Sequence, residues 1–154
     1  PLAIKLPCRY TTSNIDIIGK KMPPGVTLTK ADHDRAQIKV ALGTWDYRTY
    51  GGSKDSPVHI NTTDASTFVD FSKDPCTIAN GDLIIHKDGY ILNGASLVDA
   101  STWEWAEYTI PLNYRDLETL PTHIIVSCAA SQYGDYFTGC SSSKLWIDAV
   151  ELIY

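Results

Sequence analysis

Basic residues are scarce in this sequence relative to acidic ones. Lys and Arg together number 13 against 18 Asp and Glu, so the formal net charge is −5 at pH 7. Binding to DNA or RNA depends mainly on Lys and Arg side chains that neutralise phosphates, and no cluster of these residues is present. The composition therefore argues against a nucleic-acid partner.

Long apolar runs are also missing. The longest clearly apolar stretch, Ile124 to Ala130 with Ser127 inside it, is far shorter than the roughly 20 residues of a membrane-spanning helix. The first residues show no basic segment followed by an apolar one, which is the pattern of a signal peptide. We therefore expect no membrane insertion by this domain. Pro1 is either a mature terminus or a cut inside a longer chain.

The cysteines lack the spacing of a metal site. No two of Cys8, Cys76, Cys128 and Cys140 are separated by only the few residues typical of zinc ligands. They allow three disulfide pairings if all are oxidised, and the sequence leaves that choice open. Cys128 lies in an apolar run and is predicted to be a small buried hydrophobe, whereas Cys140 falls in a Ser-rich loop.

Strand-like alternation with turn residues between the runs recurs along most of the chain, and helical periodicity is almost absent. The predicted strands are Gln37 to Trp45, Pro57 to Asn61, Asp82 to His86, Gly89 to Leu92, Trp105 to Leu112, Thr122 to Cys128 and Leu145 to Tyr154. Two helical turns are expected, at Thr63 to Phe71 and Leu97 to Thr102. The pattern predicts one all-β domain over residues 1–154, a two-sheet sandwich of the jelly-roll type.

The last predicted strand contains an irregularity. Leu145 and Ile147 share one parity, while Val150 and Leu152 share the other. Because strand side chains alternate strictly between faces, the buried phase must switch between these pairs. One extra residue, a β-bulge at Asp148–Ala149, would produce the switch.

Several segments together resemble a known family. They are Trp45-Asp46-Tyr47, Trp105 with Tyr108 to Leu112, Pro121 to Val126, Ala130 to Gly139 and Ser143 to Tyr154. In this order they resemble the putative carbohydrate metabolism domain (PCMD) of secreted or surface proteins of Bacteroidetes. Ala130 and the Cys140-Ser141-Ser142 segment depart from the usual pattern of that family.

The resemblance implies a galactose-binding-like jelly roll at the C-terminal end of a longer chain. It also implies a secreted, periplasmic or cell-surface location, a carbohydrate partner and neighbouring domains in the same protein. These are expectations from the family and do not follow from composition or spacing.

Aromatic side chains in loops are candidates for sugar binding, because Trp and Tyr faces stack on sugar rings while polar neighbours bind hydroxyls. Two clusters and one further Trp are the candidate ligand-binding residues: Trp45, Asp46, Tyr47, Arg48 and Tyr50, then Tyr133, Asp135 and Tyr136, and Trp103. Trp45 could instead cap the core. Trp105 and Phe137 are expected to pack inward.

A structural calcium ion is the one cofactor that the last strand suggests. Calcium takes carboxylate and carbonyl oxygens, and a bulge frees carbonyls. Asp148 and Glu151 are the candidate ligands. The alternative is that Asp148 accepts hydrogen bonds from nearby amides of the bulge.

No catalytic motif stands out. A glycosidase needs two carboxyl groups across a cleft, but Glu104 and Glu107 have opposite strand parity and would face opposite ways. Asp46 with Asp135 is a second pair on paper. The Asp32-His33-Asp34 segment is interpreted as a hydrated loop just before a strand.

Three functions remain open. The first is a non-catalytic carbohydrate-binding domain for polysaccharide capture. The second is a structural or adhesive sandwich of a multi-domain surface protein, and the third is a glycoside hydrolase.

Overall fold

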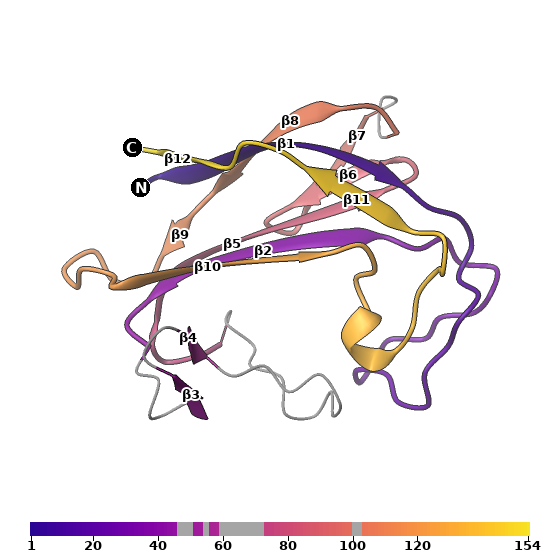
Figure 1. Ribbon diagram of the computed structural model, residues 1–154, viewed down its shortest axis with the longest axis horizontal. Coiled ribbons are helices and arrows are strands. Elements are labelled where there is room, and N and C mark those ends of the chain that lie inside the picture. Colours follow the sequence, from indigo (N-terminus) through magenta and orange to yellow (C-terminus); the bar gives the residue numbers. More distant parts are fainter. Residues whose placement is uncertain (46–50, 54–55, 59–72, 100–102) are drawn as a thin grey trace.

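The computed structural model describes residues 1–45, 51–53, 56–58, 73–99 and 103–154 (Figure 1). Its elements, in chain order, are β1 (Ala3–Thr11), β2 (Ala36–Gly43), β3 (Gly51–Ser53), β4 (Ser56–Val58), β5 (Thr77–His86), β6 (Gly89–Leu92), β7 (Ala95–Val98), β8 (Ala106–Pro111), β9 (Asn113–Tyr114), β10 (His123–Ala129), the 3-10 turn η2 (Gly134–Tyr136), β11 (Lys144–Ile147) and β12 (Glu151–Ile153). The predicted all-β class is confirmed.

Two antiparallel sheets form the sandwich. In the first, β8 pairs along one side of β1, and β11 and β12 follow each other along the opposite side. In the second, the order is β10-β2-β5-β6-β7, and β9 also pairs with β5. Figure 1 shows the first sheet lying over β2, β5 and β10, with both chain ends at the same end of the molecule.

The core lies between the sheets and is formed by every second residue of the strands that face it. On β1 the side chains of Ile4, Leu6, Cys8 and Tyr10 are at most 1% exposed. On the facing sheet Ile38, Val40, Leu83 and Ile85 are equally buried. Strand side chains alternate between faces, so each of these runs presents one apolar face inward.

Gly81 allows the two sheets to approach closely. A Cβ atom at this position would lie 2.7 Å from both Ile110 Cγ2 and the Pro111 carbonyl oxygen of β8. Any larger residue would therefore force β5 and β8 apart.

The predicted bulge in the last strand is confirmed. Ile147 pairs with Cys8 and Glu151 pairs with Lys5, so a step of four residues in the C-terminal segment matches a step of three in β1. The phase switch follows, because Ile147 and then Leu152 lie opposite the core-facing residues Cys8 and Ile4.

Pro7 fits β1 because it faces the bulge. Its carbonyl oxygen accepts the Asp148 amide at 3.1 Å. The nitrogen of a strand residue points to the same side as its carbonyl, so the missing N–H of Pro7 faces the irregular backbone, where no regular ladder partner is lost. Proline inside the run also explains why β1 is absent from the strands expected from the sequence.

Several local expectations are wrong. Leu97 and Val98 belong to strand β7 and not to a helical turn. Trp105 is 51% exposed and Phe137 57% exposed, so neither packs inward. Cys128 lies opposite core residue Ile38, but β10 is an edge strand and leaves its thiol exposed.

The other expectations fall in two groups. Strands over residues 37–45, 82–86, 89–92, 105–112 and 122–128 are confirmed to within a few residues, although β5 begins earlier. The helical turn at 63–71 and the end of the strand at 57–61 lie outside the described residues. Cys8, Cys128 and Cys140 carry free thiols, so none of the three disulfide pairings is formed. Within the described residues, no helix has the length and apolar character needed to cross a membrane.

Candidate functional site

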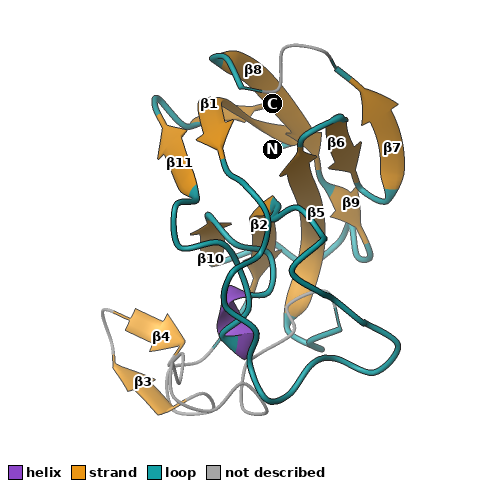
Figure 2. Cartoon of the chain, turned by 90° about the vertical axis from the view of Figure 1, so that its right-hand side faces the viewer, coloured by secondary structure: helices purple, strands orange, loops and turns teal. Residues whose placement is uncertain are grey.

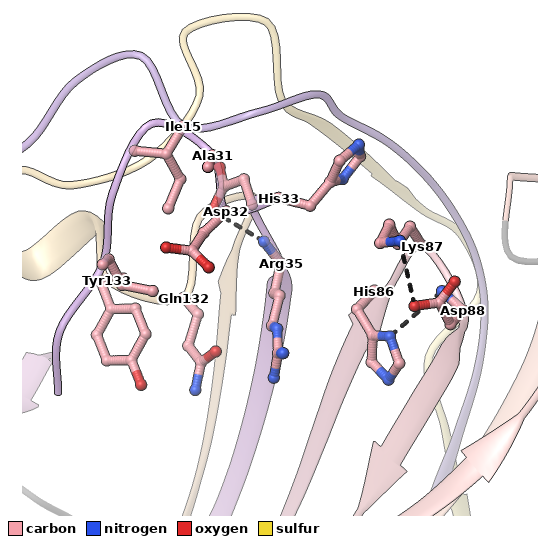
Figure 3. A pocket seen from close by; sticks show the side chains of 12 residues that line it. Ile15, Ala31, Asp32, His33, Arg35, His86, Lys87, Asp88, Gln132 and Tyr133 are labelled. Atoms are coloured by element: carbon pink, nitrogen blue, oxygen red, sulfur yellow. Dashed lines mark hydrogen bonds and ion pairs between the residues drawn. The ribbon is translucent and has the colours of Figure 1, made fainter.

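A hollow of about 330 Å³ opens at the end of the sandwich where the segment before β2, the β5–β6 turn and the segment after β10 meet (Figure 3). Figure 2 looks at this end, where η2 and the long connection from β1 to β2 lie together. The residues that line the hollow are Ile15, Leu28, Ala31, Asp32, His33, Asp34, Arg35, His86, Lys87, Asp88, Gln132 and Tyr133. We call this hollow the end pocket.

Asp34 organises the loops around the end pocket. Its side chain is 4% exposed, and its Oδ2 accepts the Ser131 hydroxyl at 2.6 Å, the Ser143 hydroxyl at 2.7 Å and the Cys140 amide at 2.8 Å. Its Oδ1 accepts the Arg35 amide at 2.9 Å. A buried carboxylate is stable only when such donors replace water. The interpretation of residues 32–34 as a hydrated loop is therefore wrong for Asp34.

Further hydrogen bonds connect the segment after β10 to β1 and to the segment before β2. The backbone amide of Gln132 donates to the Arg35 carbonyl at 2.7 Å. The Tyr10 hydroxyl donates to the Ala130 carbonyl at 2.9 Å, and burial raises the pKa of Tyr10 to about 12. Tyr10 therefore keeps its proton and remains a donor at neutral pH. Groups next to both sheets therefore fix the backbone of the segment after β10 by hydrogen bonds.

Four polar side chains point the same way in the end pocket. Figure 3 shows the ends of Arg35, His86, Gln132 and Tyr133 directed toward one side of the view. In the part of the chain that the structure describes, the Arg35 guanidinium, the side-chain amide of Gln132 and the Tyr133 hydroxyl form no hydrogen bond or ion pair with protein groups. These groups are thus available to a bound molecule.

The β5–β6 turn sets the protonation of His86. The Asp88 amide donates to His86 Nδ1 at 3.3 Å, so Nδ1 acts as the acceptor and the proton of the neutral ring belongs on Nε2. Burial and then the positive charge of Arg35 lower the pKa of His86 below its usual value. Lys87 pairs with Asp88 at 3.5 Å, between Nζ and Oδ2.

The structure brings one of the predicted ligand-binding residues, Tyr133, into the end pocket. Asp135 and Tyr136 lie in η2, next along the chain, and do not line it. Trp103 is half-buried and does not line the pocket, and its ring centroid lies 5.9 Å from that of Tyr10 and 6.0 Å from that of His33. Asp46, Tyr47, Arg48 and Tyr50 lie outside the described residues.

Trp45 has a core role and is corrected as a sugar-binding candidate. Its ring is 2% exposed and packs with Ala41, Cys76 and Ile125 on the outer side of the larger sheet. No ring face remains open to stack on a sugar in this arrangement.

The predicted calcium ligands are engaged elsewhere. Asp148 Oδ1 accepts the Ala149 amide at 2.9 Å, where Ala149 has a φ of 31°, and Glu151 pairs with Lys5 at 3.2 Å. Within the described ranges, no group of three or more His, Cys, Asp or Glu side chains is arranged to hold a metal ion. The bulge is therefore completed by Asp148 itself, as an amide acceptor.

Sequence reasoning missed Arg35, His86 and Gln132. Two weak signals pointed toward them. Arg35 directly follows the polar Asp32-His33-Asp34 segment, and His86 directly precedes the turn residues Lys87 and Asp88. Neither signal reveals that the two strand ends meet, because that follows from the pairing of β2 with β5, in which Ala36 lies opposite Ile85.

The fold and pocket define an all-β sandwich domain with a polar hollow at one end. The family described as "putative carbohydrate metabolism domain" (PCMD) matches residues 28–153. The chain therefore belongs to this family, and the resemblance noted in the sequence is confirmed.

The fold is also similar to that of a solved structure, a putative glycoside hydrolase from Bacteroides thetaiotaomicron. The TM-score is 0.59 at 17% sequence identity, and the match covers 100% of this chain and 38% of that protein. At this identity the likeness concerns the fold, and the chain spans well under half of that protein's length. The comparison with curated proteins finds no match.

Proposed function

We propose that this domain binds carbohydrate without cleaving it, and that the end pocket holds a sugar unit. The observation that carries the proposal is the set of unpaired polar ends of Arg35, Gln132 and Tyr133, pointing the same way in one hollow. Sugar sites combine an aromatic face with polar groups that bind hydroxyls. Tyr133 supplies the aromatic group here, and the family's link to carbohydrate supports the assignment.

The size and rigidity of the end pocket also suit this role. Its volume of about 330 Å³ is at the lower end of small-molecule sites, which hold about 300–1,000 Å³. A pocket of this size matches one sugar unit of a longer glycan better than a whole oligosaccharide. Asp34 holds the surrounding loops through four hydrogen bonds, so little order has to be created on binding.

Binding is favoured over hydrolysis because each carboxylate of the pocket already has a partner among the protein's own groups. Hydrolysis of a glycosidic bond needs one carboxyl group that donates a proton and a second that acts as base or nucleophile. Asp34 engages four donors, Asp88 pairs with Lys87, and Asp32 Oδ2 accepts both the amide and the hydroxyl of Thr29. Release of reducing ends from a polysaccharide by the isolated domain, lost in Asp32→Asn, would instead support a glycoside hydrolase.

The proposed setting is polysaccharide capture by a longer secreted, periplasmic or surface protein. The match to 38% of a larger protein supports a domain within a multi-domain chain. A domain of this kind would keep its host protein on the polysaccharide.

A glycan array spanning plant, host and microbial polysaccharides tests the proposal. We expect binding to at least one class, and its loss in Tyr133→Ala. Tyr154→Ala is the matched control, since Tyr154 is 82% exposed and does not line the end pocket. Signals at background for every glycan would overturn carbohydrate binding.

A structural role is the second candidate, and one observation favours it. The inward face of edge strand β10 is incompletely covered, with Ile124 41% and Val126 37% exposed. Such a face suits a neighbouring domain of the same protein. This role predicts that attachment of the neighbouring domain raises the melting temperature, that Val126→Ser removes the increase, and that Tyr133→Ala has no effect.

A further inference from the structure

The acceptors and the donors of the end pocket differ in how many of them already have hydrogen-bond partners within the protein. Asp34 accepts from four donors, whereas Asp32 uses only Oδ2, for Thr29, and Asp88 only Oδ2, for Lys87, so that in the described part of the chain Oδ1 of each of these two carboxylates stays free. The donors of the Arg35, Gln132 and Tyr133 side chains, by contrast, have no hydrogen-bond partner among the described residues. A ligand that enters the pocket therefore meets more free donors than free acceptors, and this imbalance favours acceptor-rich chemistry.

Arg35 is the strongest of the free donors. Its side chain is exposed, lines the end pocket and extends in the same direction as those of His86 and Gln132 (Figure 3). Among residues 1–45, 73–99 and 103–154, no acceptor pairs with its guanidinium. Lys87, the other permanent cation of the pocket, forms an ion pair with Asp88. A planar guanidinium with five N–H groups binds a carboxylate through two parallel hydrogen bonds.

His86 adds a neutral donor next to this cation. Its Nδ1 already accepts the Asp88 amide, so Nε2–H is left for a ligand. An Arg with one adjacent N–H donor supplies the kinds of donor that a carboxylate accepts. The Gln132 amide and the Tyr133 hydroxyl remain for the hydroxyl groups of the same sugar.

We propose that the end pocket takes a uronic acid unit of an acidic glycan, with Arg35 binding its carboxylate. This inference rests on the proposed carbohydrate-binding function and names its ligand class. The overall charge of −5 opposes it only weakly, because exposed charges farther apart than about 8 Å are largely screened at physiological salt. The lining itself carries three carboxylates, those of Asp32, Asp34 and Asp88, and two cations, and Arg35 is the cation that forms no ion pair with them.

Calorimetric titration with matched ligands tests the inference. The probes are oligosaccharides of galacturonate, mannuronate and glucuronate, each beside its methyl ester, which keeps the hydroxyls and removes the charge. We expect at least one acid to bind about ten- to a hundredfold more tightly than its ester, the range for hydrogen bonds to a charged group. Arg35→Gln should remove that preference and leave the affinity for the ester within about twofold.

Lys144→Gln is the matched control, because Lys144 carries the same charge at an exposed position and does not line the end pocket. It should keep the preference for the acid. Melting curves of both variants confirm that each is folded, as expected for substitutions at exposed positions.

The outcomes separate the two proposals. Equal affinity for acids and esters, with Tyr133→Ala abolishing both, overturns the uronate inference and leaves carbohydrate binding intact. Binding of sulfated neutral glycans without binding of any uronate also overturns it. No binding of any glycan overturns both.

Discussion

The Ser131 hydroxyl donates to the buried Asp34 carboxylate at 2.6 Å and so joins the segment after β10 to the segment before β2. Asp34 lines the end pocket and Ser131 directly precedes the lining residues Gln132 and Tyr133, although the two bonded residues are 97 positions apart in the sequence. The contact positions Gln132 and Tyr133, which follow Ser131, beside Arg35, which follows Asp34. The polar side chains of the pocket are thus positioned by one buried carboxylate whose two oxygens accept from protein donors.

Replacement of Asp34 should therefore destabilise the whole domain. In Asp34→Asn the side-chain amide cannot accept from all four donors, so buried hydroxyl and amide groups lose partners. We expect a loss of about 2–4 kcal/mol in unfolding free energy, measured by urea denaturation. Asp32→Asn, at an exposed neighbour, should cost less than about 1 kcal/mol. Equal losses in the two variants would contradict the role given to Asp34.

Gly139 should tolerate no side chain. A Cβ atom there would lie 2.4 Å from Ser131 Oγ and 3.1 Å from Asp34 Oδ2, inside the hydrogen-bond cluster. We expect Gly139→Ala to destabilise by about 1–3 kcal/mol in the same urea assay. Gly134→Ala is the control, since its Cβ would meet Ser131 Cβ at an ordinary 3.7 Å. If Gly134→Ala is the more damaging change, the packing around Asp34 is misassigned.

The bulge in the last strand should be improved by glycine. Ala149 has a φ of 31°, which an L-residue adopts at a cost and glycine does not. Ala149→Gly should raise the unfolding free energy by about 0.5–1 kcal/mol, after allowance for glycine's greater freedom in the unfolded chain. Ala95→Gly, at a regular position of β7, should lower it. Destabilisation by both changes would argue against strain at Ala149.

Calcium should not stabilise the domain. The Asp148 carboxylate accepts the Ala149 amide and Glu151 pairs with Lys5, so neither carboxylate is held ready for a metal. We expect the same melting temperature in excess chelator and in added calcium. A clear rise with calcium that disappears in Asp148→Ala would restore the metal site.

Acid should weaken the fold in part through His86. Burial, and then the charge of Arg35, lower the pKa of His86 in the folded state below the ordinary value of about 6.5. The adjacent Asp88 raises this pKa by a smaller amount, and Lys87 lowers it. The unfolded chain therefore binds a proton first, and this part of the stability is present above about pH 6.5 and is lost as the pH falls through the folded-state pKa. The urea midpoint should fall less between neutral and mildly acidic pH in His86→Gln than in the parent protein. Identical pH profiles would show that His86 contributes nothing.

Much of the fold could be predicted because the alternation of apolar residues is a local property. Ile38, Val40 and Leu42 identify β2, and the parity change from Ile147 to Val150 predicts the bulge that pairing with Cys8 and Lys5 confirms. The prediction of buried residues failed where the position of a strand in its sheet decides which side chains are covered. Ile124, Val126 and Cys128 share the predicted face, yet they stay exposed because β10 is an edge strand.

The candidate site shows the same division. Tyr133 could be found from the sequence because an aromatic residue in a loop is a recognisable signal. Arg35 and His86 could not, since each is an ordinary polar residue at a strand end, and only the register of β2 against β5 brings them into one pocket.

By itself the sequence determined the all-β class, most strand positions, the bulge at Asp148 and the family, because these depend on local periodicity and motif order. Tertiary structure alone decided that Asp34 is buried, that Trp45 packs against the sheet and that the end pocket holds unpaired donors around Arg35. Burial and hydrogen-bond satisfaction depend on residues distant in the chain, and no local pattern specifies which segments will meet.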